Sequence, residues 1–144
     1  MKLQQLSLFL ENRSGQLREP CELLAAAGID LMTMSLADTT QFGILRFIVR
    51  DPAAAKKVLE EAGMVVVMTE VVPVEVDNRP GGLARALAAI EDAGLGVEYM
   101  YDFGAASRGG KAAIIFRFED PDAALAALSK AGIRVPTVEE LLAS

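Results

Sequence analysis

The first regularity in the chain is a period of two in its apolar positions, and it occurs twice. Leucine occupies every second position of residues 6–10, and valine does the same in residues 72–76. This period is typical of a strand that buries one of its faces. Apolar residues at helical spacing follow each strand and end at Ala-Gly, so each copy predicts a first helix that stops at Gly28 or Gly94.

These strands belong to an internal repeat. Residues 11–17, ENRSGQL, return as residues 77–83, DNRPGGL, with four of seven positions identical. In both copies the glycine after the helix lies 13 positions after the glycine of this motif, and the only difference in length is three extra residues before Lys111. A repeat that covers the whole chain predicts two domains, residues 1–69 and 70–144.

Each copy reads as strand, helix, strand, strand, helix and strand. We expect the second strands at residues 29–36 and 95–101. Asp-Pro at 51–52 and 120–121 predicts the start of the second helix, because Asp caps a helix and Pro suits its first position. The predicted fold class is therefore α+β, with two tandem ferredoxin-like domains that each place helices on one face of an antiparallel sheet.

Four places depart from a plain repeat. Pro20 lies beyond the expected helix start, so the first helix should begin late or bend. The strand expected at residues 64–68 runs almost directly into the next strand, without a flexible linker. Residues 104–110, rich in Gly, predict a mobile loop and lack the spacing of a phosphate loop. Copy two should end in a short strand at residues 133–135 and, after a capping box, a last helical turn at residues 139–143.

Composition narrows the function classes. A formal net charge of -6, from 14 Lys and Arg against 20 Asp and Glu, argues against a nucleic-acid or anionic-membrane partner. One cysteine and no histidine exclude an internal disulfide and a thiolate zinc cluster, and they remove the commonest general base. We therefore assign no catalytic residue, metal or cofactor and disfavour an enzyme. No signal peptide or membrane span is recognisable, so we expect a cytoplasmic protein.

The two motifs, each followed by an amphipathic helix, AGI or AGL and a strand, resemble the opening of ACT domains. The similarity covers nearly the whole chain as two tandem copies. ACT domains are small-molecule sensing modules that typically bind amino acids and work in pairs. The resemblance implies a ligand at the interface between paired domains, touching the turn after the first strand and the start of the second strand. It also implies a homodimer that regulates an enzyme of amino-acid metabolism, such as acetolactate synthase.

Roles follow from the resemblance residue by residue. Asn12 and Asn78 match the turn asparagine whose amide contacts the ligand, and Gly15 and Gly81 match the glycine that lets backbone amides approach it. A helix N-terminus also favours a carboxylate, which agrees with this placement. The ligand-binding residues expected in this way are Asn12, Arg13, Ser14, Gly15, Gln16, Leu17, Asp30, Asn78, Gly81, Gly82 and Leu83.

The two copies differ at the start of the second strand. Asp30 matches a ligand-contacting position, where a carboxylate could hold an α-ammonium group, whereas the equivalent Gly96 has no side chain. We therefore expect the second site to be weaker or different. Two alternatives stay open: the motifs can be turns and helix caps of a purely structural dimerisation module, and Arg13 and Arg79 can be solvated or paired at an interface.

Overall fold

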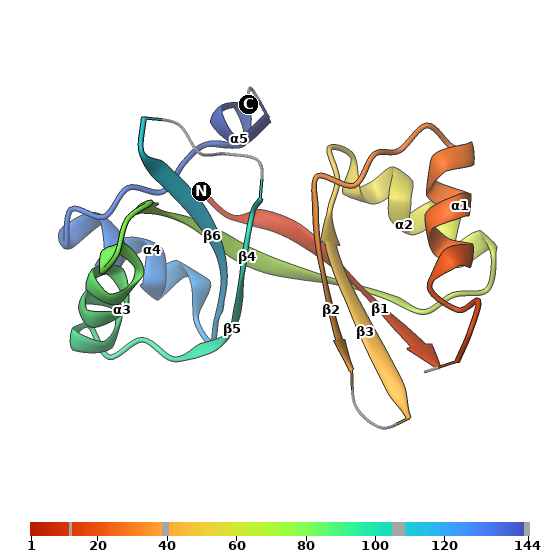
Figure 1. The fold of residues 1–144 in the computed structure, drawn as a ribbon, viewed down its shortest axis with the longest axis horizontal. Helices are drawn as coiled ribbons and strands as arrows, with labels where there is room; N and C mark the ends of the chain where they lie inside the picture. The colour runs from red at the N-terminus through yellow and green to blue at the C-terminus, as the bar shows by residue number, and fades with distance from the viewer. Residues whose placement is uncertain (12, 39–40, 105–108, 143–144) are drawn as a thin grey trace. The chain divides into compact units, whose positions relative to one another are not determined.

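A computed structural model describes all of the chain except Asn12 and residues 39–40, 105–108 and 143–144 (Figure 1). The centre of the loop expected to be mobile, residues 105–108, thus lies outside the described residues. The chain divides into two compact units: the first unit is Gln4–Thr69, and the second unit is Glu70–Ser144 with Met1–Leu3. The division falls within strand β4 (Val66–Asp77), which is continuous, so the prediction of no flexible linker is confirmed.

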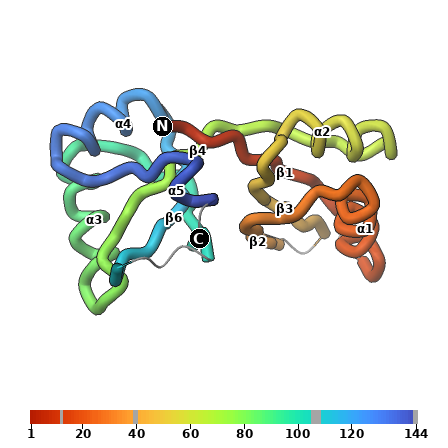
Figure 2. Tube along the Cα trace, turned by 90° about the horizontal axis from the view of Figure 1, so that it is seen from above, coloured from red at the N-terminus to blue at the C-terminus, as the bar shows by residue number. Residues whose placement is uncertain are grey.

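The first unit has antiparallel strands in the order β2-β3-β1. Its helices α1 and α2 lie on the same side of β2 and β3 in both views, and they contact each other (Figures 1 and 2). Its elements are β1 (Leu3–Glu11), α1 (Arg18–Ala26), β2 (Thr33–Asp38), β3 (Phe42–Ile48) and α2 (Pro52–Glu61), followed by the start of β4.

The second unit repeats this arrangement with antiparallel strands in the order β4-β6-β5. Helices α3 and α4 lie on one side of β5 and β6 and contact each other (Figures 1 and 2). Both units therefore place helices on one face of an antiparallel sheet, which confirms the predicted α+β, ferredoxin-like class. The further elements are α3 (Gly82–Asp92), β5 (Val97–Asp102), β6 (Lys111–Phe118), α4 (Pro121–Lys130) and α5 (Val138–Leu142).

Each unit has its own apolar core. Leu6 and Leu8 of β1 are fully buried in the first unit, and Val72 and Val74 of β4 are fully buried in the second. The period of two therefore buries the face that it predicted. The first core also contains Leu24, Leu45, Phe47, Ala55 and Leu59, and the second also contains Ile90, Phe116, Phe118, Ala124 and Leu128.

The first helices of the two units start at different positions of the repeat. Helix α3 begins at Gly82, whereas α1 begins at Arg18, two positions later in the repeat. Pro20 is buried in the first turn of α1, where its missing N–H breaks no helical hydrogen bond. The late start predicted from Pro20 is confirmed. Gly28 and Gly94 end the two helices as predicted, with φ of 72° and 71°.

The second strands begin later than the sequence predicted. Strand β2 starts at Thr33 and β5 at Val97, not directly after the glycines that end the helices. The N–H of Ile29 donates to the carbonyl of Leu24 at 2.9 Å, so the first residues after α1 complete the helix end. They do not pair in the sheet, and the strand is correspondingly shorter.

The Asp-Pro signals mark helix starts as predicted. A side-chain oxygen of Asp51 accepts the N–H of Ala54 at 3.1 Å, and one of Asp120 accepts the N–H of Ala123 at 3.1 Å. Each proline occupies the start of its helix, where its missing N–H would have no partner.

The prediction of a strand at residues 133–135 is wrong. The N–H of Glu75 donates to the carbonyl of Arg134 at 2.9 Å, but the three residues form no strand. The proline that follows them lacks the N–H that a ladder needs. The capping box is confirmed: Thr137 Oγ1 accepts the N–H of Glu140 at 3.2 Å, and α5 begins directly after Thr137.

Candidate functional site

Backbone hydrogen bonds shape the turn between β4 and α3. The N–H of Asn78 donates to the carbonyl of Gly110 at 2.7 Å, and the N–H of Gly82 donates to the carbonyl of Arg79 at 3.0 Å. Gly81 is the N-cap residue of α3 and has φ of 87°, a left-handed conformation that favours glycine. The turn therefore places the start of α3, with the N–H groups of its first turn, beside the end of β4.

An open hollow of 530 Å³ lies beside this turn. Strand register explains which residues meet there, because Asp102 of β5 lies opposite Ile114 of β6, and Ala112 of β6 lies opposite Val76 of β4. The hollow is lined by Val76, Asp77, Asn78, Arg79, Pro80, Leu83, Asp102, Ala112 and Ile114. It thus combines charged groups of both signs with apolar side chains.

Sequence reasoning found only part of this site. Of the four residues expected to bind a ligand in the second unit, Asn78 and Leu83 line the hollow, whereas Gly81 and Gly82 form the turn beside it. The sequence also suggests that Asp102, with Tyr99 and Tyr101, could form a polar pocket near residues 107–111, but it does not assign Asp102 or the residues of β6 to the ligand site, because they lie far from the motif in sequence. Only the pairing of β4, β5 and β6 brings them to the turn, and a correct register would have been the signal for them.

Three cations surround Asp77 at the end of β4. Its carboxylate pairs with Lys111, with Arg85 at 3.0 Å and with Arg79 at 3.3 Å. The hydrogen bond from Lys111 is the largest cause that lowers the pKa of Asp77 below its ordinary value, and partial desolvation opposes it. Asp77 therefore stays ionised and holds three basic side chains around the start of α3.

The matching turn of the first unit is described from Arg13 onward, and Asn12 lies outside the described residues. The N–H of Gln16 donates to the carbonyl of Arg13 at 3.3 Å, as Gly82 does in the second unit. The Arg13 side chain pairs with Glu11 at 3.1 Å. Residues 13–17 are exposed except Gln16, which is half-buried. Lys111 and Arg85 thus have no basic counterpart in this turn, since Phe42 and Glu19 hold the matching positions.

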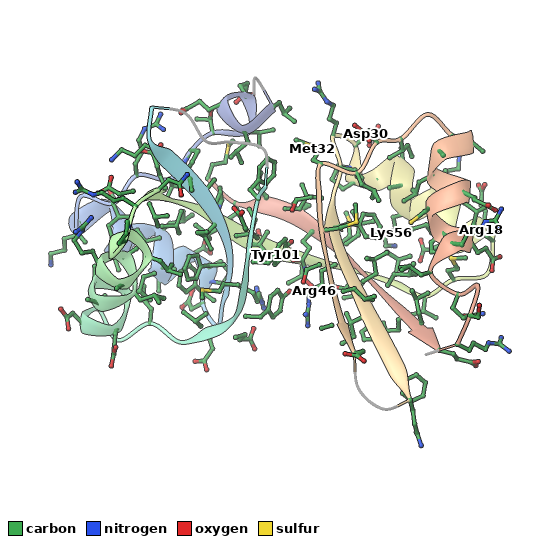
Figure 3. The ribbon with its side chains drawn as sticks, in the orientation of Figure 1. Arg18, Asp30, Met32, Arg46, Lys56 and Tyr101 are labelled. Atoms are coloured by element: carbon green, nitrogen blue, oxygen red, sulfur yellow. The ribbon has the colours of Figure 1, made fainter. Side chains whose placement is uncertain are left out.

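Asp30 does not lie at the turn of its own unit. Helix α1 separates them, because it begins just after residues 13–17 and ends four residues before Asp30. Its nine residues span about 13 Å at 1.5 Å per residue. Figure 3 shows Asp30 near Met32, away from Arg18 at the start of α1. The two parts of the expected site therefore lie at opposite ends of α1.

The side chain missing at Gly96 is replaced by another residue. A Cβ atom at Gly96 would lie 2.6 Å from Cδ of Glu119, and the Glu119 N–H donates to the carbonyl of Gly96 at 3.1 Å. A carboxylate thus lies over the position that matches Asp30. Glu119, which directly follows β6, thus brings an acidic group to the place where Gly96 has no side chain, and a weaker or different second site stays a prediction.

Among the described residues, no three His, Cys, Asp or Glu side chains gather in a way that could hold a metal ion. Cys21 is half-buried on α1. Among the helices that the structure describes, none is both long and apolar enough to cross a membrane.

Comparison with protein families identifies the repeat. A family model described as an ACT domain pair matches residues 1–137. The chain belongs to the ACT domain pair family. This confirms the resemblance seen in the two motifs, and it makes the two units a pair of ACT domains. A search of curated proteins found no match.

Solved structures share this ACT pair fold. A protein from Bacteroides thetaiotaomicron is 36% identical, has a TM-score of 0.89, and aligns over 98% of this chain and 96% of its own. The ligand-free regulatory subunit of aspartate kinase from Thermus thermophilus is 20% identical, with a TM-score of 0.63 over 89% of this chain and 91% of its own. The Thermus flavus regulatory subunit of aspartate kinase is 18% identical, with a TM-score of 0.60 over 91% of this chain and 92% of its own.

Proposed function

We propose that this ACT pair is an amino-acid sensor that regulates a partner enzyme of amino-acid metabolism. One observation carries the proposal: the hollow at the Asp77–Leu83 turn joins a basic side chain, two carboxylates and an apolar wall. A free amino acid has a complementary carboxylate, ammonium and side chain. Small-molecule sites usually have this make-up, a mostly apolar wall with a few placed polar groups.

Pairing of two chains completes the proposal. A ligand cannot contact both the turn and the position of residue 30 within one unit, because α1, about 13 Å long, separates them. A homodimer would bring these two parts together from different chains. Phe9 and Phe42 support such pairing, because they share the sheet face away from the core and are 50% and 53% exposed.

Regulation is proposed from the family and from its neighbours. The Thermus proteins of similar fold are regulatory subunits of aspartate kinase, an enzyme of amino-acid metabolism. We infer a partner of the same kind for this chain, with acetolactate synthase as one candidate. The cytoplasmic location expected from the sequence stays a prediction.

A thermal-shift screen against the twenty amino acids tests the sensor. A ligand at 100 times its Kd adds about 2.7 kcal/mol to the free energy of unfolding, which raises Tm by roughly 5 to 10 °C. We expect at least one amino acid to do so. A dimer whose Tm responds to none of them would instead support the alternative, a purely structural dimerisation module.

A further inference from the structure

The first residues of β4 form an open edge of the first unit's sheet. In the register of β4 on β6, Val72 lies opposite Phe116, so the last residue of β6, Phe118, reaches only as far as Glu70. Among the strands that the structure describes, β1 is the one that borders residues 66–69. The other edge of these residues therefore has no strand beside it in the described part of the chain.

This edge lacks the usual protection against pairing with another chain. Residues 64–69 contain no charged residue and no proline. Val66 is buried in the core of the unit, whereas Val65 and Val67, which alternate with it, are 67% and 44% exposed. Native edge strands usually carry a charge, a proline or a bulge that prevents pairing. An uncharged edge rich in β-branched residues is therefore suited to a partner strand.

Helix α2 lies beside this edge and has charges of both signs. Its side chains three and four residues apart share one face of the helix, with the lysines before the glutamates along the chain. This face borders an open hollow of 530 Å³ that is lined by Met68 of β4 and by Ala53, Lys56, Lys57, Glu60 and Glu61 of α2. The edge strand and the charged face of α2 thus form one surface.

Two of these charges have no partner among the described residues. Lys56 pairs with Glu60 at 2.9 Å. Lys57 and Glu61 are exposed, and neither makes an ion pair or a hydrogen bond within the part of the chain that the structure describes. Each of them is therefore available to a charge of the opposite sign on another molecule.

A second copy of this surface has the matching charges. When two α2 helices lie antiparallel about a two-fold axis between them, Lys57 of each copy faces Glu61 of the other. The same axis makes the two β4 edges antiparallel. A register centred on Val66 then places Val65 of one copy opposite Val67 of the other, so that no charge enters the strand pair. The surface is thus complementary to itself in both its charged and its apolar part.

The second unit lacks these features at the matching positions. In its helix α4, Ala126 holds the position of Lys57. Lys130 holds that of Glu61, so the sign of the charge is reversed there. Residues 133–135, which match the start of β4, form no strand and precede a proline. The repeated fold itself therefore does not require this surface, which is particular to the first unit.

We propose that the edge of β4 and the charged face of α2 dock a second copy of this chain across a two-fold axis. The two first units then share one antiparallel sheet, with their α2 helices side by side on it. This inference goes beyond the proposed sensor function. Its outcome is separate from that of the ligand site, because neither the turns nor Asp30 belong to this surface.

Sedimentation equilibrium of the full chain measures the dissociation constant of this association. We expect wild type to associate at micromolar concentration. Lys57→Glu and Glu61→Lys should each weaken association about 10-fold, because either change replaces two attractive contacts across the axis by two repulsive ones. An equimolar mixture of the two variants should associate nearly as tightly as wild type, since the mixed pair has opposite charges at both contacts.

Two further variants test the charge and the strand edge separately. Lys130→Glu on α4 changes the net charge as much as Lys57→Glu does, and it should leave association unchanged. Val67→Lys places a charge in the strand pair and should weaken association more than either single variant of α2. Far-UV circular dichroism confirms that each variant folds.

Several results would overturn the proposal. One is a wild-type protein that stays monomeric at tens of micromolar. Another is a Lys57→Glu variant that associates as tightly as Lys130→Glu, or a mixture of the two α2 variants that is as weak as each alone. Unchanged association of a folded Val67→Lys would overturn it as well, because the strand edge would then take no part.

Discussion

A Cβ atom on Gly82 would lie 1.9 Å from the carbonyl oxygen of Asp77. No side chain is compatible with that distance, so only glycine lets the start of α3 approach the last residue of β4 this closely. The first unit has Gln16 at the matching position, and its helix starts later, at Arg18. Gly82 therefore brings α3 against the turn at which the hollow forms.

Gly82→Ala should destabilise the second unit. The added methyl group meets backbone atoms, which cannot move aside as a flexible side chain can, so the free energy of unfolding should fall by about 1 to 3 kcal/mol. Urea denaturation measures this loss. Gln16→Ala at the matching position is the control and should change stability by less than about 0.5 kcal/mol. Similar losses in the two variants would show that the close approach at Gly82 has no special cost.

The Asp77 cluster should make stability depend on pH under acidic conditions. The pKa of Asp77 is lowered in the folded protein, mainly by its hydrogen bond with Lys111, so the ionised form stabilises the fold above the ordinary carboxyl pKa. That contribution is lost as pH falls below about 4 and through the lowered pKa. The difference in unfolding free energy between wild type and Asp77→Asn should therefore shrink across this range.

A carbon-detected NMR titration of the Asp77 carboxyl group measures the pKa itself. It should lie below the ordinary value for aspartate, and it should move toward that value in Lys111→Met, where the largest cause of the shift is removed. A titration at the ordinary pKa in wild type would contradict the cluster.

Helix capping by Asp120 should contribute measurable stability. Asp120→Ala removes the acceptor for the N–H of Ala123 and should cost about 1 kcal/mol in urea denaturation. Asp120→Ser keeps a side-chain oxygen at the cap and should recover most of the loss. If serine and alanine are equally destabilising, the cap bond is not the cause.

Much of the fold could be predicted because its signals are local. The period of two in residues 6–10 and the Asp-Pro pair at Asp51 each fix a strand face or a helix start from neighbouring residues alone. The strand expected at residues 133–135 failed because a strand also needs a partner along its length, and the bond from the Glu75 N–H to the Arg134 carbonyl does not extend into a ladder. The local pattern carries no information on how far such pairing extends.

The site could be predicted only where it coincides with the motif. Asn78 and Leu83 follow from the resemblance of the motif to ACT domains, whereas Asp102 reaches the hollow through the register of β5 on β6. Glu119 fills the space above Gly96 for a similar reason, because Val97 and Phe118 pair in that ladder. Cross-strand neighbours need the exact pairing, and a single sequence does not show it.

An NMR titration of the uniformly ¹⁵N-labelled protein tests the central claim most directly. The ligand is the amino acid that raises Tm most in the thermal screen, or L-leucine at millimolar concentration if none does. We expect the amide signals of Asn78, Arg79, Leu83 and Ala112 to shift together and to saturate, because these residues line the hollow. Signals that stay unchanged at these four residues, whether no amide shifts or only distant ones such as Lys57 of α2 do, would contradict an amino-acid site at this turn.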